Sequence, residues 1–281
     1  MGGHDHTDIF DRGLQFDLST LIARRRLLGL FAGAGLAATV GCAPDSEPSP
    51  TSSTSATRDP SSSSSVSAAA GNTTREIPEE TAGPFPGDGS NGPNVLTRSG
   101  IVRRDIRSSF GTSSTVAGGV SLTIELAVLD LADASKPLTG GAVYLWHCDR
   151  EGRYSMYSSG VTNETFLRGV QEVDGLGKVS FTSIFPGCYS GRWPHIHFEV
   201  YRSLASATSA GNKIATSQIA LPQDACEAVY ATDGYGASVR NLSTVTLAGD
   251  NVFRDGYADE LGTVTGTTGA GMTVALSVPV R

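Results

Sequence analysis

The feature that most constrains this chain is an alternating stretch that carries two of its five histidines. It runs Pro186-Gly-Cys-Tyr-Ser-Gly-Arg-Trp-Pro-His-Ile-His-Phe198. Side chains alternate between the two faces of a β-strand, so His195 and His197 share one face while Ile196 points to the other. Two imidazoles side by side are half of a metal site, because neutral imidazole binds iron, zinc and copper. The alternative is a pair of histidines in a sheet with no metal bound.

Two tyrosines add oxygen donors to this pattern. Tyr189 precedes His195 in the same stretch, and Tyr154 follows a strand-like run and a glycine turn. A phenol has an unperturbed pKa of about 10, so it ionises readily only beside a strong Lewis acid. The phenolate is a hard anionic donor, which suits ferric iron better than zinc, a thiolate and imidazole binder, or calcium, a carboxylate and carbonyl binder. The residue types therefore indicate a ferric site.

Several runs resemble the intradiol ring-cleavage dioxygenases, which are the catechol, hydroxyquinol and protocatechuate dioxygenases with non-haem ferric iron. Three of them are Trp146-His-Cys-Asp-Arg-Glu-Gly-Arg-Tyr154, Phe166-Leu-Arg-Gly-Val-Gln171 and the stretch from Pro186 to Phe198. Thr81-Ala-Gly-Pro-Phe85 and Ser99-Gly-Ile-Val-Arg-Arg-Asp-Ile106 are similar to segments that this family carries ahead of its core. The resemblance covers about residues 76 to 255.

The resemblance implies a complete active site. The ligands of Fe(III) would be Tyr154, Tyr189, His195 and His197. Tyr189 aligns with the tyrosine that leaves the metal when substrate chelates it, and Tyr154 with the tyrosine that stays. Arg192 aligns with an arginine that stabilises negative charge on the substrate, and Gln218 with a glutamine near the metal. A catechol-type diol and O2 would then give a cis,cis-muconate-type diacid.

Neighbouring residues have simpler interpretations. Without a site, Arg192 would be a surface ion-pair arginine. Tyr157 is assigned to the core in preference to the site, and Trp193 either walls a pocket or packs. His147 lies in an alternating strand and matches no ligand position, so we interpret it as structural.

Short alternating runs predict an all-β fold, specifically a β-sandwich. The clearest are Leu122–Val128, Val143–His147 and Met272–Val278, with turn signals between them. Pro222–Thr232 is expected to form a short helix. The 281 residues suffice for one sizeable domain. The family resemblance implies the same architecture, with metal-bearing loops and little helix.

The first 75 residues differ in composition from the rest. Residues 1–42 combine a polar leader, Arg24-Arg-Arg26, an apolar run and Cys42, and they resemble a twin-arginine export signal. Thr39-Val-Gly-Cys42 resembles a lipobox, which would make Cys42 a lipid anchor. Residues 43–75 are rich in Ser, Thr and Pro, so we expect a disordered linker. The predicted protein is exported, extracellular or held at the cell surface as a lipoprotein, with a catalytic domain over residues 76–281.

The net charge limits the classes of binding partner, and the cysteines allow a disulfide. A net charge of −7 argues against nucleic acid or an anionic membrane as a partner. We expect a monomer or small homo-oligomer. Export permits a disulfide, and we favour Cys188–Cys226, with Cys148 as a small buried residue.

Two other functional classes stay open at the level of sequence. One is a non-catalytic β-sandwich binding module that retains the fold. The other is a zinc or copper protein built on the His-x-His pair. The two tyrosines and the lack of a suitable third histidine disfavour the second class.

Overall fold

The computed structural model describes residues 75–281. The predicted export signal with Cys42 and nearly all of the predicted linker lie outside the described residues. Within residues 75–281, the helices are too short and too polar to cross a membrane.

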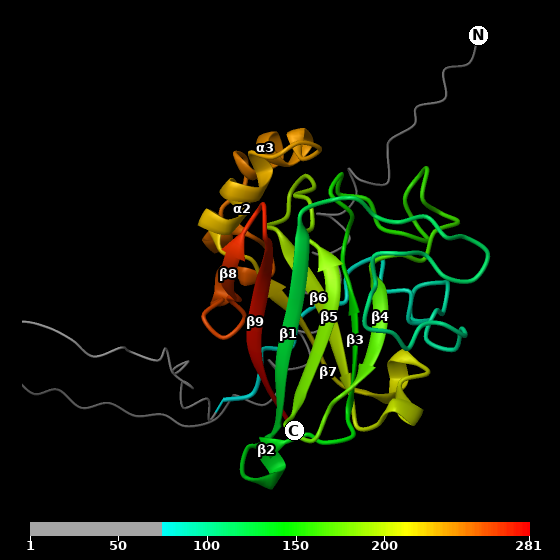
Figure 1. Cartoon of the computed structure of the whole chain (residues 1–281). Coiled ribbons are helices and arrows are strands. Elements are labelled where there is room, and N and C mark those ends of the chain that lie inside the picture. Colours follow the sequence, from blue (N-terminus) through cyan, green and yellow to red (C-terminus); the bar gives the residue numbers. More distant parts are fainter. Residues whose placement is uncertain (1–74) are drawn as a thin grey trace, which may run out of the picture.

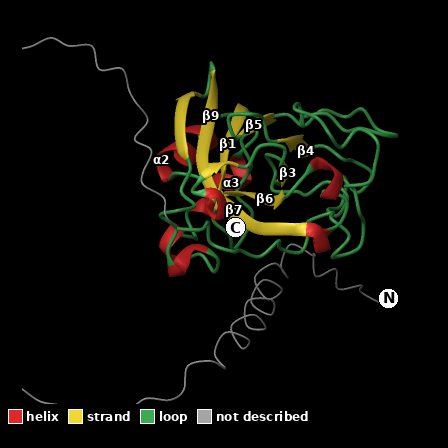
Figure 2. Ribbon diagram, turned by 90° about the horizontal axis from the view of Figure 1, so that it is seen from below, coloured by secondary structure: helices red, strands yellow, loops and turns green. Residues whose placement is uncertain are grey.

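The fold is all-β, as predicted, and consists of two stacked sheets (Figures 1 and 2). One sheet contains β1 (Ser121–Asp130), β2 (Lys136–Pro137), β5 (Lys178–Ile184), β8 (Thr263–Thr267) and β9 (Gly271–Val280). The other has the order β4-β3-β6-β7, with β3 (Ala142–Trp146), β4 (Arg168–Glu172), β6 (His195–Tyr201) and β7 (Lys213–Ala220).

The sandwich carries little helix. The described residues contain α2 (Gln223–Tyr230) and α3 (Gly236–Leu242), which lie together at one end of the sandwich in Figure 1. Short 3₁₀ helices occupy Leu131–Asp133, Leu204–Ser206, Ala210–Asn212, Leu247–Gly249 and Phe253–Asp255. The helix predicted over Pro222–Thr232 is confirmed as α2.

Hydrophobic alternation explains the core. In β1, the buried positions are Leu122, Ile124, Leu126 and Val128, every second residue. They pack against apolar side chains of the other sheet in one large cluster. Full burial of each such side chain contributes about 1.5–3 kcal/mol. The periodicity that predicted a strand is therefore the periodicity that fills the sandwich.

A segment before β1 closes one side of the sandwich. Arg103 N–H donates to Val170 O of β4 at 3.0 Å, and Ile106 N–H donates to Thr182 O of β5 at 2.9 Å. One short segment thus pairs with an edge strand of each sheet. This covers two edges that would otherwise present unpaired backbone groups.

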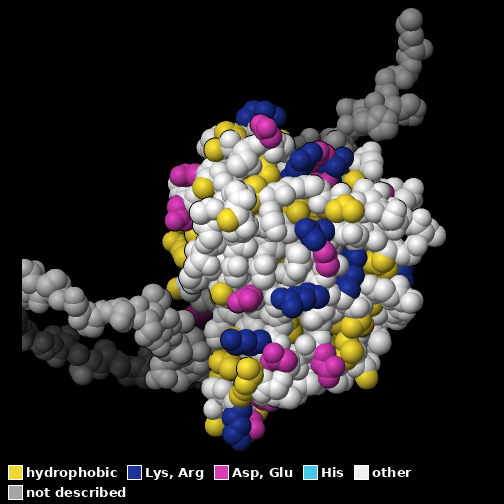
Figure 3. All heavy atoms as spheres, viewed as in Figure 1, with side chains coloured by type: hydrophobic (Ala, Val, Ile, Leu, Met, Phe, Trp, Pro, Cys, Tyr) yellow, Lys and Arg dark blue, Asp and Glu magenta, His cyan; other side chains and the backbone are white. Residues whose placement is uncertain are grey.

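On the face drawn in Figure 3, positive and negative side chains are interspersed.

Candidate metal centre

The candidate centre lies on the outer face of the four-stranded sheet, where β3 ends and β6 begins. Directly paired residues lie on one face of a sheet. The register therefore forms a row across the four strands, namely Arg168, Trp146, His197 and Gln218. His195 shares this face, and Ile196 between the histidines belongs to the core between the sheets. The predicted strand geometry of the His-x-His pair is confirmed.

Two loops bring the tyrosines to this face. Tyr154 lies between β3 and β4, and Tyr189 lies between β5 and β6. Asp149 shapes the first loop, since its carboxylate accepts the N–H groups of Glu151 and Arg153, both at 2.9 Å. Tyr154 N–H donates to Ser158 Oγ at 2.9 Å. The loop is thus fixed on both sides of Tyr154.

The four predicted donor atoms converge on one point. His195 Nε2 lies 3.1 Å from His197 Nε2, 3.2 Å from Tyr189 Oη and 3.4 Å from Tyr154 Oη. Both histidines and Tyr154 are buried, whereas Tyr189 is half-buried. The structure brings together all four residues that the sequence predicted as ligands.

Hydrogen bonding alone does not satisfy this cluster. His195 Nδ1 lies 2.5 Å from Trp193 O, so Nδ1 carries the proton and Nε2 offers one lone pair. Three groups compete for that lone pair: two phenols and His197 Nε2. His197 Nδ1 is also buried without a hydrogen-bond partner in the described part of the chain. A cation among these donors would resolve the competition, and two phenolic oxygens with two imidazoles suit ferric iron. The residues fit Fe(III).

Electrostatics also favour neutral imidazoles. Burial lowers the pKa of His195 well below its usual value, and the charge of Arg192 acts in the same direction. Burial, followed by His195 and Arg192, lowers the pKa of His197. Burial raises the pKa of Tyr154 well above its usual value, with Tyr189 adding to the effect. The histidines are therefore in the form that binds metals, and Tyr154 needs a cation to ionise.

Arg192 is buried beside the centre, with 1% of its side chain exposed, so a surface ion-pair role is wrong. Its Nε donates to Asp250 Oδ2 at 2.9 Å, and its Nη2 donates to Gln218 Oε1 at 2.7 Å. Gln218 Nε2 in turn donates to Thr81 O at 2.9 Å. Gln218 therefore holds the guanidinium and the segment that begins at Thr81. Asp250 lies in no recognised motif, so the sequence did not predict that it holds Arg192.

The other predicted residues take structural roles. His147 points to the opposite face, where its Nε2 lies 2.7 Å from Ser183 Oγ, as its structural interpretation requires. Tyr157 is half-buried, and its hydroxyl accepts the N–H of Gly87 at 2.9 Å. Trp193 is buried, and its indole N–H donates to Leu221 O at 2.8 Å, so it packs.

The predicted disulfide is wrong. Cys148, Cys188 and Cys226 are all buried free thiols, which confirms only the burial of Cys148. Cys188 Sγ contacts Arg192 O at 3.5 Å, and Cys226 Sγ contacts Leu221 O at 4.0 Å. These two thiols donate to carbonyls near their own positions in the chain, whereas Cys148 Sγ donates to Gly187 O at 3.4 Å. Burial raises the pKa of the Cys188 thiol to about 12.

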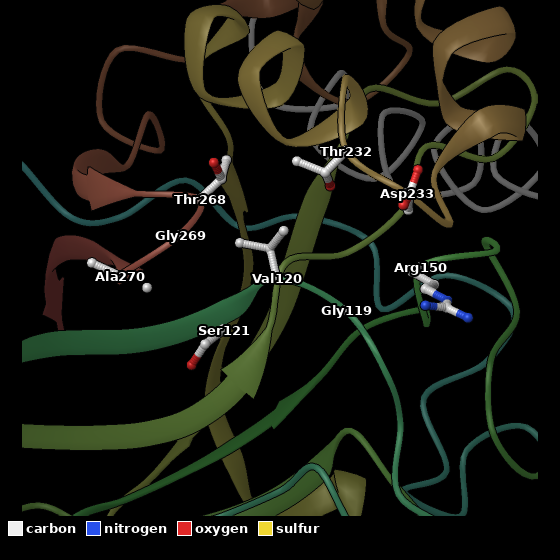
Figure 4. Close-up of a pocket in the computed structure, with 10 residues that line it drawn as sticks. Gly119, Val120, Ser121, Arg150, Thr232, Asp233, Thr268, Gly269 and Ala270 are labelled. Carbon is white, nitrogen blue, oxygen red and sulfur yellow. The ribbon is translucent and has the colours of Figure 1, made fainter.

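Other parts of the described chain offer no rival metal site. Within residues 75–281, no three His, Cys, Asp or Glu side chains form a group suited to a metal ion, so the centre needs its tyrosine oxygens. A polar surface hollow has a volume of about 460 Å³ and is lined by Gly119–Ser121, Arg150, Thr232, Asp233 and residues 268–271. Figure 4 shows these residues around it. None of the four predicted ligands lines this hollow.

The fold is the all-β sandwich seen in solved intradiol dioxygenases. Residues 92–226 match the model of the family described as Dioxygenase, and this segment contains all four candidate ligands, Arg192 and Gln218. This match agrees with the family expected from the motifs. No curated protein matches the chain.

Solved structures with a TM-score above 0.5 share the fold. An intradiol ring-cleavage dioxygenase from Tetranychus urticae superimposes with a TM-score of 0.54 at 23% identity, over 64% of this chain and 87% of that chain. The dioxygenase domain of a carbohydrate-binding fusion protein from Streptomyces sp. SirexAA-E gives a TM-score of 0.46 at 23% identity, over 73% and 97%. Catechol 1,2-dioxygenase from Pseudomonas arvilla C-1 gives 0.46 at 20% identity, over 73% and 62%.

Proposed function

We propose that the domain is a non-haem Fe(III)-dependent intradiol dioxygenase that cleaves catechol-type substrates with O2 to cis,cis-muconate-type diacids. The observation that carries the proposal is the convergence of two tyrosine oxygens and two imidazole nitrogens around His195 Nε2, within 3.1 to 3.4 Å. The match of residues 92–226 to the model of the Dioxygenase family supports the same reaction class.

The four converging residues would hold Fe(III). Bound there, the ion would supply a Lewis acid that chelates both oxygens of a catechol and activates its ring toward O2. Tyr154 is almost fully buried and tied into its loop, so it is the ligand that stays in place. Tyr189 is half-buried, and its oxygen is the natural acceptor of a proton from a substrate hydroxyl.

Arg192 supplies a fixed positive charge beside the ligands. Asp250 and Gln218 hold its guanidinium from two sides, so it needs no reorganisation when negative charge develops on the ring. Arg192 and Trp193 are both buried, and charge interactions are stronger in such a low-dielectric environment than in water.

The test is a visible spectrum of the iron-loaded full-length protein, with and without catechol in the absence of O2. We expect a phenolate-to-ferric charge-transfer band that shifts to longer wavelength with catechol. After O2 is admitted, both atoms of labelled O2 should appear in a muconate-type product.

Two variants sharpen the test. Tyr154→Phe should abolish or strongly shift the band, whereas Tyr257→Phe, which changes a partly buried tyrosine of a separate cluster, should leave it in place. A protein that binds no iron and stays colourless would contradict the dioxygenase and favour the binding module. A visible band without ring cleavage would contradict the reaction but retain the metal site.

A further inference from the structure

Arg168 is a buried arginine whose five N–H donors are all used. It begins β4, within the Phe166–Gln171 motif, and is 1% exposed. Its Nε donates to Ser155 Oγ at 3.0 Å, Nη1 to Pro86 O at 2.7 Å and Tyr144 Oη at 3.0 Å, and Nη2 to Phe85 O and Ser155 O, both at 2.9 Å. One guanidinium therefore joins the β3–β4 loop, a neighbouring strand and the segment before β1.

The partners of Arg168 are neutral. Among the described residues no carboxylate pairs with it, in contrast to Arg192, which has Asp250. Replacing buried ion pairs by apolar residues is often neutral or stabilising, so buried charge is weak evidence for a purely stabilising role. A rigid planar fork that fits five acceptors is instead suited to fixing geometry.

What Arg168 fixes lies directly against Tyr154. Ser155 is the next residue along the chain. The ring of Phe85 lies 5.1 Å from the ring of Tyr154, centroid to centroid. Gly87 (φ +69°) makes the close approach possible, because a Cβ there would lie 3.0 Å from Arg168 Nη1. Arg168 thus acts on Tyr154 through its own backbone and through the ring that covers it.

Strained backbone flanks the same contact. Met156, next to Ser155, has φ +73°, and Leu167, next to Arg168, has φ +58°. These conformations are unfavourable for bulky residues and persist where the surroundings enforce them. Both ends of the Arg168–Ser155 contact therefore carry strain, as expected where the chain is held in one geometry for a functional reason.

We propose that Arg168 is a positioning residue that locks the Tyr154 side chain in its ligating orientation. This inference rests on the proposed function, because it gives a reason why Tyr154 would stay on the iron while Tyr189 leaves it. Arg168 also shares the cross-sheet row with His197, so it connects the tyrosine loop to a histidine ligand through the sheet.

The test compares Arg168→Lys with Arg103→Lys in the full-length protein. Arg103 is the comparison, since its guanidinium also donates to backbone carbonyls, at Ser108, Thr165 and Arg168 itself, but not to Phe85 or Ser155. It supports the backbone of Arg168 without sharing the acceptors of the Arg168 guanidinium, so the pair of variants isolates the guanidinium's own contacts. In the metal-free protein, Arg168→Lys should speed amide hydrogen exchange in residues 84–91 and 154–158 at least tenfold. Arg103→Lys should leave exchange there unchanged.

Iron-loaded protein supplies two further measurements. Arg168→Lys should shift the charge-transfer band and lower kcat at least tenfold with KM nearly unchanged, and Arg103→Lys should do neither. If Arg168→Lys does not fold, Ser155→Ala and Tyr144→Phe each remove one acceptor and should give smaller changes of the same sign.

The outcomes separate the two proposals. Equal loss of stability in both lysine variants, with exchange and spectrum unchanged, would overturn the positioning role and leave Arg168 structural. A wild-type protein that stays colourless with iron would overturn the proposed function instead. Exchange in the metal-free variants would still decide whether Arg168 fixes Tyr154.

Discussion

At the scale of single residues, Gly152 is where the two tyrosine-bearing loops touch. It has φ +84°, and a Cβ added there would lie 3.0 Å from Tyr189 Cβ and 3.4 Å from Tyr189 Cα. Glycine adopts this backbone conformation without a steric penalty, and its missing side chain lets the second loop approach. A single glycine therefore sets the distance between Tyr154 and Tyr189, two residues whose oxygens must reach the same point.

Gly152→Ala should separate these two loops. The left-handed conformation costs a residue with a Cβ about 1–2 kcal/mol, and the contact with Tyr189 adds to this cost. Gly160→Ala is a matched control, because Gly160 has φ +81° but its added Cβ would find only Arg153 Nη1 at 3.8 Å. Urea unfolding should show a larger decrease in the free energy of unfolding for Gly152→Ala than for Gly160→Ala. Iron titration should show weaker iron binding for Gly152→Ala alone. Equal effects on iron binding would show that the contact is irrelevant to the site.

At the scale of elements, the sequence predicted what local periodicity encodes. Alternation places His195 and His197 on one face of β6, and the pairing of β6 with β7 then brings Gln218 opposite His197. The sequence did not predict the role of Asp250, which forms an ion pair with Arg192 from a loop far along the chain. The Asp250 carboxylate also accepts the N–H of Trp193 at 2.7 Å, so it joins the loop to the start of β6. No periodicity marks such a contact, because it depends on how elements pack.

Asp250→Ala should release the Asp250 loop from β6. Removing one partner of a buried ion pair costs about 3–5 kcal/mol, because the other charge stays buried. Asp133→Ala is the control, since the Asp133–Lys136 pair is mostly exposed and such pairs contribute about 0–1 kcal/mol. Chemical denaturation of both variants measures the difference. If Asp250→Ala lowers the free energy of unfolding as little as Asp133→Ala does, the buried Arg192–Asp250 pair does not anchor the loop.

At the scale of the whole molecule, the fold class was predictable and the long-range pairings were not. Apolar alternation in β1 and β9 is enough to predict a sandwich, because one face of each sheet must be buried, whereas β3 is buried at every position. The disulfide prediction failed because it set Cys148 aside as a buried residue, and burial did not distinguish it: all three cysteines are buried free thiols. The motif around Arg168 was recognised, but its role became visible only when Phe85, Ser155 and Tyr144 were found around one guanidinium.

Buried carboxyl groups make the stability of the whole domain depend on pH. Burial first, and then Glu80, raises the pKa of Glu260 from 4.5 to about 9. Burial first, and then Asp255, raises the pKa of Glu80 to about 8. A raised pKa in the folded state means that the native protein keeps a proton that the unfolded chain releases. The stabilisation is therefore complete below pH 4.5 and is lost as pH rises through the folded-state pKa.

Glu260→Gln should flatten this decline, because glutamine mimics the protonated acid and does not titrate. Between about pH 5 and 8, one such group contributes a slope of up to about −1.4 kcal/mol per pH unit to the free energy of unfolding, and the variant should lack it. Glu172→Gln is the control, since Glu172 is exposed at the end of β4 and the same replacement there leaves the buried carboxyl groups in place. Urea unfolding of the metal-free proteins across this pH range measures the slopes. A wild-type slope in Glu260→Gln would mean that Glu260 is already ionised in the folded domain at neutral pH, and that its buried oxygens are solvated or paired despite their burial.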